Sequence, residues 1–127
     1  MTSSVRNWFE GFTGRRVKSI EIGGQTVYVR SITERERCLI DEAQFDQKTG
    51  KPLPATEGKL RARYFVACVC NESGVAEFDA TDLDMLMQLD DAIATPLFAA
   101  IREHLQLPTA ADLKQLGNDS GETGAQD

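Results

Sequence analysis

Two alternating segments joined by a pair of glycines constrain the fold of this chain more than any other feature. Residues 17–22 and 25–30 alternate apolar and polar side chains, and Gly23-Gly24 lies between them. This pattern predicts a β-hairpin with a two-residue turn. The turn sets the strand pairing: Ile22 with Gln25, Ile20 with Val27, and Lys18 with Val29. One face of the hairpin then carries Ile20, Ile22, Val27 and Val29. A lone hairpin is only marginally stable, so helices must cover this face.

Helix start signals follow the hairpin. Thr33 and Glu36 have the spacing of a capping box, so we expect a helix from there to about Phe45. Its inward side chains are expected to be Leu39, Ile40 and Ala43. Residues 46–56 are rich in glycine, proline and polar side chains, which predicts a mobile loop.

The second half of the chain carries further helical periodicity. A long helix is expected over 57–72, ended by Ser73-Gly74, and Thr81 is expected to cap the next helix. Thr95-Pro96 predicts that another helix starts there, since proline suits the first helical position. The inner stripe of that helix is expected to be Leu97, Phe98, Ile101 and Leu105. A last short helix is expected over 109–116.

These elements predict an α+β fold, mainly α, in which an N-terminal hairpin packs on a small bundle of about four to five helices. The 127 residues fit one globular domain over 1–117, made of a short N-terminal helix, the hairpin 17–30 and helices to 117. Residues 118–127 lack large apolar side chains and are expected to form a disordered polar tail.

The N-terminal segment has an aromatic helical face. Val5, Trp8, Phe9 and Phe12 have the spacing of one side of a helix. This helix either packs on the core of its own chain or docks on another subunit. A membrane-surface role is disfavoured, because Arg6 is the segment's one cation and such helices are usually rich in lysine and arginine.

Composition excludes several classes of function. A net charge of −6 argues against a general nucleic-acid binder, whose affinity depends on neutralising phosphates. The chain has no apolar run near the roughly 18 residues that a membrane-spanning helix needs, nor a signal-peptide pattern. Its three cysteines are an odd number, so we expect free thiols in a reducing cytoplasm.

No residue cluster indicates catalysis, a cofactor or a metal. His104 is the one histidine and is expected to be a surface or half-buried side chain. Cys68 and Cys70 lack the spacing of zinc and redox sites and are expected to pack in the core. The aspartates of 79–91 fail the calcium-loop template and suit helix starts instead. We therefore expect a non-enzymatic interaction protein.

The succession of elements resembles the tail assembly chaperones of long-tailed bacteriophages. The resemblance covers about residues 20–117, and it lies in the order of the segments 26–37 (TVYVRSITERER), 60–74 (LRARYFVACVCNESG), 78–83 (FDATDL), 97–101 (LFAAI) and 111–113 (ADL). In this order a strand ending in arginine leads through a threonine cap into a charged helix. A helix closing on a glycine turn follows, and then the later helices.

The resemblance implies a non-catalytic role. Such chaperones bind the tape-measure protein, bring in tail-tube subunits and are absent from the finished particle. It therefore implies the tape-measure protein and the major tail (tube) protein as partners, self-association, and action in the host cell cytoplasm. The alternative is a structural subunit of the tail, such as a connector or tail-completion protein, that is retained in the virion.

The resemblance carries over no binding residues, so partner-binding candidates come from expected exposure. Trp8, Phe9 and Phe12 are candidates if the first helix is exposed. Tyr28 and Arg30 are candidates because they lie on the face of the hairpin opposite its apolar side chains.

Overall fold

The hairpin is the first part of a three-stranded antiparallel sheet. The computed structural model describes residues 4–106. Strands β1 (Val17–Ile22) and β2 (Gln25–Arg30) pair in the predicted register, with Ile20 opposite Val27. Gly23 and Gly24 have φ of 58° and 81°, as a two-residue turn between twisted strands requires. A third strand, β3 (Val69–Cys70), pairs with β2 on its other edge.

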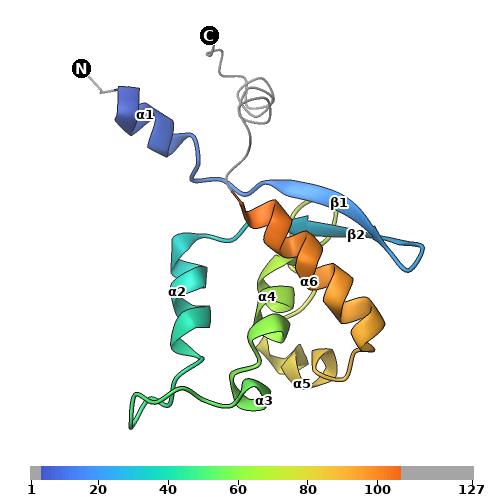
Figure 1. Cartoon of the computed structure of the whole chain (residues 1–127). Helices are drawn as coiled ribbons and strands as arrows, with labels where there is room; N and C mark the ends of the chain where they lie inside the picture. Colours follow the sequence, from blue (N-terminus) through green and yellow to red (C-terminus); the bar gives the residue numbers. More distant parts are fainter. Residues whose placement is uncertain (1–3, 107–127) are drawn as a thin grey trace.

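One face of this sheet rests on helices that come later in the chain (Figure 1). These are α4 (Leu60–Cys68) and α6 (Asp91–Leu105), and α5 (Leu83–Leu86) packs on α4. The buried cluster that they share with the sheet is Val29, Ala62, Phe65, Cys68, Val69, Leu86, Leu97 and Ile101. The apolar side chains of the hairpin, Ile20, Ile22 and Val27, pack against this cluster. The α+β, mainly α class and the covered hairpin face are therefore confirmed.

Helix α2 (Glu34–Glu42) starts where the capping box predicts. The Thr33 hydroxyl accepts from the backbone N–H of Glu36, and the Glu36 carboxylate accepts from that of Thr33. The helix ends before Phe45, which instead forms a β-bridge with Pro52. Ile40 is buried as expected, but Leu39 is 55% exposed, so the prediction that it faces inward is wrong.

The helix expected over 57–72 is broken at both ends. A short helix, α3 (Ala55–Gly58), comes first, and Lys59 has a left-handed φ of 53° that separates it from α4. Buried Gly58 fixes this break, since its carbonyl accepts from Gln44 and Arg63. At the far end the chain leaves the helix at Val69, because pairing with β2 outweighs the local helical pattern.

The next helical start lies two residues earlier than predicted. Asp79, and not Thr81, caps the 3₁₀ turn η1 (Ala80–Asp82) that leads into α5. Its carboxylate accepts from the N–H of Thr81, while Asp82 accepts from the N–H of Asp79. The short aspartate side chain reaches the orphan N–H groups of this first turn.

No helix starts at Thr95-Pro96. Helix α6 begins at Asp91, capped by the Asp90 carboxylate, and continues through Pro96 to Leu105. Pro96 has no N–H group to donate to the preceding turn, which disfavours a helix at this position. The burial of Leu97 and Ile101 in the core offsets this cost, so the helix continues through Pro96. The expected helix over 109–116, the tail over 118–127 and the domain limit at 117 lie outside the described residues.

Candidate partner-binding surfaces

Helix α1 (Ser4–Glu10) and the turn after it, which holds Phe12, carry an exposed aromatic cluster. No residue of the helix is buried, and the helix projects away from the sheet and the other helices (Figure 1). Val5 is 65%, Trp8 50%, Phe9 64% and Phe12 37% exposed. The sequence left two alternatives for this segment, and the structure does not show the first, in which the helix packs on the core of its own chain.

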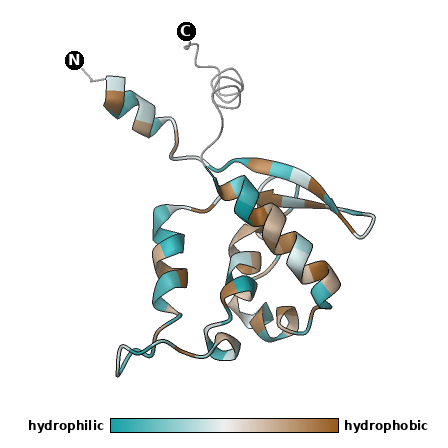
Figure 2. Ribbon diagram, viewed as in Figure 1, coloured by the Kyte–Doolittle hydropathy of each residue, from teal (hydrophilic) through white to brown (hydrophobic). Residues whose placement is uncertain are grey.

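The aromatic rings of this segment contact one another. The Trp8 ring centroid lies 5.5 Å from that of Phe9 and 4.9 Å from that of Phe12. Hydropathy colouring shows apolar bands on this isolated helix (Figure 2). We call Val5, Trp8, Phe9 and Phe12 the aromatic helix face. A contiguous apolar surface that its own fold leaves uncovered is typical of a protein-binding site.

The two hairpin candidates lie in a different environment. Tyr28 is half-buried and sits opposite Cys70 of β3. Arg30 is also half-buried, and its guanidinium donates to the carbonyls of Ala67 and Gly74 at 2.9 Å each. Arg30 therefore ties β2 to the end of α4 and the following turn, and the expected free exposure of its side chain is wrong. Among residues 4–106, no ring contact or hydrogen bond joins either side chain to the aromatic helix face.

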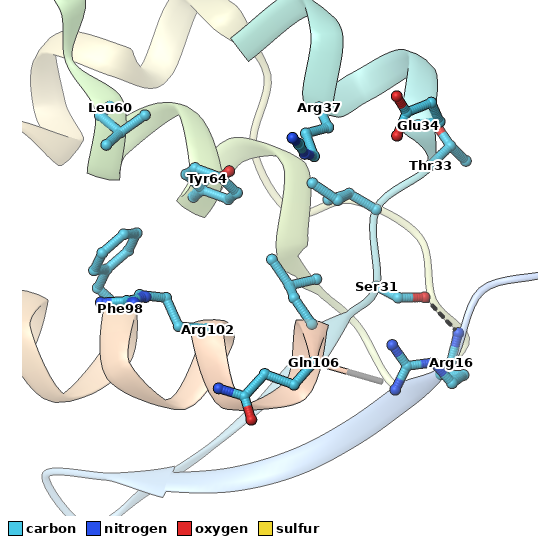
Figure 3. A pocket seen from close by; sticks show the side chains of 12 residues that line it. Arg16, Ser31, Thr33, Glu34, Arg37, Leu60, Tyr64, Phe98, Arg102 and Gln106 are labelled. Atoms are coloured by element: carbon cyan, nitrogen blue, oxygen red, sulfur yellow. Dashed lines mark hydrogen bonds between the residues drawn. The ribbon is translucent and has the colours of Figure 1, made fainter. Parts of the chain in front are cut away.

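A second surface, which the sequence patterns did not reveal, is a groove of about 560 Å³ between α2, α4 and α6. We call it the arginine groove. It is lined by Arg16, Ser31, Ile32, Thr33, Glu34, Arg37, Leu60, Tyr64, Phe98, Arg102, Leu105 and Gln106. Figure 3 shows these side chains arriving from three helices and from the segments that flank the sheet.

Two aromatic rings form part of the apolar lining of the arginine groove. Tyr64 of α4 and Phe98 of α6 meet edge to face, with ring centroids 5.7 Å apart. The guanidinium groups of Arg61 and Arg102 lie 5.1 and 5.9 Å from the Phe98 ring centroid. Such cation–π contacts hold the arginines beside the ring without neutralising their charge.

The charge of the groove opposes that of the whole chain. Three arginines line it, Arg16, Arg37 and Arg102, against one carboxylate, Glu34. Burial lowers the pKa of Arg16, but an arginine remains protonated at neutral pH. The net charge of the chain is −6, so this positive patch is a local feature of the tertiary structure.

His104 supports the edge of this groove. Its Nε2 lies 2.9 Å from the carbonyl oxygen of Arg16, which joins the end of α6 to the start of the sheet. Burial is the main cause of a lowered pKa for this imidazole. The side chain is half-buried, in agreement with the sequence-based expectation.

The cysteines do not form a reactive centre in the described part of the chain. Cys68 and Cys70 are buried, as expected, although the second lies on a strand and not on a helix. Burial raises the pKa of the Cys68 thiol to about 12. Within residues 4–106 no group of three or more histidine, cysteine or acidic side chains has the arrangement of a metal site. No helix in that range is long and apolar enough to span a membrane.

Comparisons with known proteins give a likeness of fold. No family model matches this chain, and no curated protein matches it. Among solved structures, the tail assembly chaperone of bacteriophage HK97 is similar, with a TM-score of 0.54 and 14% sequence identity. The likeness covers 71% of this chain and 85% of that one. The chain therefore has a fold like that of a phage tail assembly chaperone.

Proposed function

We propose that this chain is a non-catalytic chaperone of phage tail assembly, which binds the tape-measure protein and recruits tail-tube subunits. The likeness of fold to the HK97 protein is the observation that carries the proposal. The chain acts in the host cell cytoplasm and is absent from the mature virion, as befits an assembly factor that leaves its client.

The aromatic helix face suits the capture of such a client. A long, largely helical and aggregation-prone protein exposes apolar stripes before its final partner covers them. Trp8 and Phe9 present large rigid rings that lose little side-chain entropy on binding. Because the face stands clear of the core, a client helix can bind it without opening the fold.

An affinity capture experiment tests the proposal. The tagged chain is expressed with its native gene cluster, and mass spectrometry identifies the co-purified proteins. We expect the tape-measure protein and the tail-tube protein. Recovery of connector or portal proteins in their place would contradict the proposal.

Analysis of purified virions separates the chaperone from the structural alternative. A chaperone should be absent from the finished particle, whereas a connector or tail-completion subunit should be present in a fixed number per particle. Detection of the chain at such a fixed stoichiometry would favour the structural role.

A further inference from the structure

We propose that the arginine groove is a second binding site, for an acidic amphipathic helix of a partner protein. The apolar stripe of that helix packs on Tyr64 and Phe98, and its flanking carboxylates bind Arg37 and Arg102. This site is separate from the aromatic helix face, and the proposal holds whichever partner the aromatic helix face takes.

The residues that line the arginine groove form a surface on which a third helix can pack. Leu60 and Tyr64 lie four residues apart on α4, while Phe98, Arg102 and Leu105 follow one side of α6. Side chains at these spacings form one row along each helix. A third helix packs in the groove between two such rows, as helices do with interaxial distances of about 8–10 Å. The volume of about 560 Å³ accommodates several of its side chains.

The charges of the groove select an acidic occupant. Two basic side chains outside the groove have close carboxylate partners: Arg15 with Glu36 at 2.6 Å and Lys59 with Asp84 at 2.9 Å. In the groove, the ion pair of Arg37 is a 3.8 Å contact with Asp41 in which both side chains are more than half exposed. A contact of that kind contributes little.

Arg102 completes the cationic rim. Within residues 4–106 its guanidinium contacts the Phe98 ring, and that contact leaves its hydrogen-bond donors available to a carboxylate. Guanidinium groups bind carboxylates through paired hydrogen bonds, so two arginines on facing helices can fix the position of an acidic helix. Figure 3 shows Arg37 and Arg102 on opposite sides of the groove.

The same charges argue against two other occupants. The α1 helix of a second copy has one acid, Glu10, already paired with Arg6 at 3.1 Å, so it offers the groove no excess negative charge. Nucleic acid would meet the net charge of −6 over the rest of the molecule. A protein helix with several carboxylates beside an apolar stripe satisfies both the apolar lining and the cations.

The test uses two synthetic peptides and the full-length chain. The acidic probe is a fluorescein-labelled helix of about 18 residues, with leucines on one stripe and glutamate and alanine elsewhere. The control peptide has lysine in place of every glutamate. Fluorescence anisotropy at low salt should show binding of the acidic probe, and affinity at least about tenfold lower for the lysine peptide.

Two charge reversals on one helix give a matched comparison. Arg37→Glu changes a groove residue, and Arg35→Glu makes the same charge change two residues earlier, on the other side of α2. We expect Arg37→Glu to weaken binding about tenfold and Arg35→Glu to leave it within about twofold. Arg102→Gln, which removes one charge on α6, should also weaken binding. Circular dichroism confirms that each variant is folded.

Several results would overturn the proposal. These are no binding of the acidic probe, equal binding of the lysine peptide, or equal losses for Arg37→Glu and Arg35→Glu. Displacement of the probe by a single-stranded oligonucleotide of about 20 nucleotides that binds more tightly would assign the groove to nucleic acid. A change of sedimentation with Arg37→Glu, without probe binding, would assign it to a second copy of the chain.

Discussion

Replacing Trp8 and Phe9 by alanine should separate partner binding from stability. The two side chains are 50% and 64% exposed, so each retains about 100 Å² of accessible aromatic surface. Covering that area in a complex is worth about 2.5 kcal/mol per side chain at 25 cal/mol per Å². Because neighbouring contributions are not additive, we expect the double variant to lose at least about 100-fold in affinity for the captured client.

The same variant should fold almost as well as the parent chain. Neither ring belongs to the buried cluster, and surface substitutions of this kind usually change stability by less than about 1 kcal/mol. For a chain of this size that corresponds to a melting temperature lower by no more than about 4 °C. Thermal unfolding and biosensor binding to the client, measured on the same preparations, test both statements.

Met85→Ala is the control for the loss of an exposed apolar side chain elsewhere on the surface. Met85 lies on α5, is 49% exposed and is remote from α1 (Figure 1). We expect it to leave client affinity unchanged. Full binding by the Trp8/Phe9 variant, together with a loss of more than about 2 kcal/mol of stability, would refute the reasoning and make these rings ordinary packing residues.

Three further outcomes follow from the burial and ion pairing of particular side chains. Phe65→Ala empties a site that is 1% exposed and should cost about 3–5 kcal/mol in denaturant unfolding; a loss below 1 kcal/mol would show that the core is packed otherwise. The hydrogen bond from the Arg15 guanidinium lowers the pKa of Glu36 below its usual 4.5. The ionised Glu36 carboxylate therefore stabilises the fold fully above pH 4.5, and this stabilisation is lost as the pH falls through the lower pKa of the folded state. Glu36→Gln should therefore flatten the acid limb of the stability profile, and an unchanged limb would contradict this. A thiol reagent at pH 8 should modify exposed Cys38 quickly and buried Cys68 only on unfolding, as peptide mapping would reveal.

Local rules determined the hairpin, the capping box and the overall class. The Gly23-Gly24 turn sets a register between residues that are neighbours in sequence, so no distant contact is needed to define it. The same holds for Thr33 and Glu36, which satisfy each other's backbone within one turn. The aromatic helix face was also visible as a periodic pattern, although its exposure was one of two alternatives until the fold was known.

Tertiary contacts decided the rest. Val69 and Cys70 carry a helical pattern in sequence but form a strand, because the free edge of β2 offers them hydrogen bonds. Pro96 signals a helix start, yet the burial of Leu97 and Ile101 carries α6 through it. The arginine groove unites Arg16, Arg37 and Arg102, which lie in three separate segments, and the last two each stand beside a glutamate in the sequence. Side chains so far apart in the sequence gather in one site only through the packing of the elements that carry them, which no local pattern specifies.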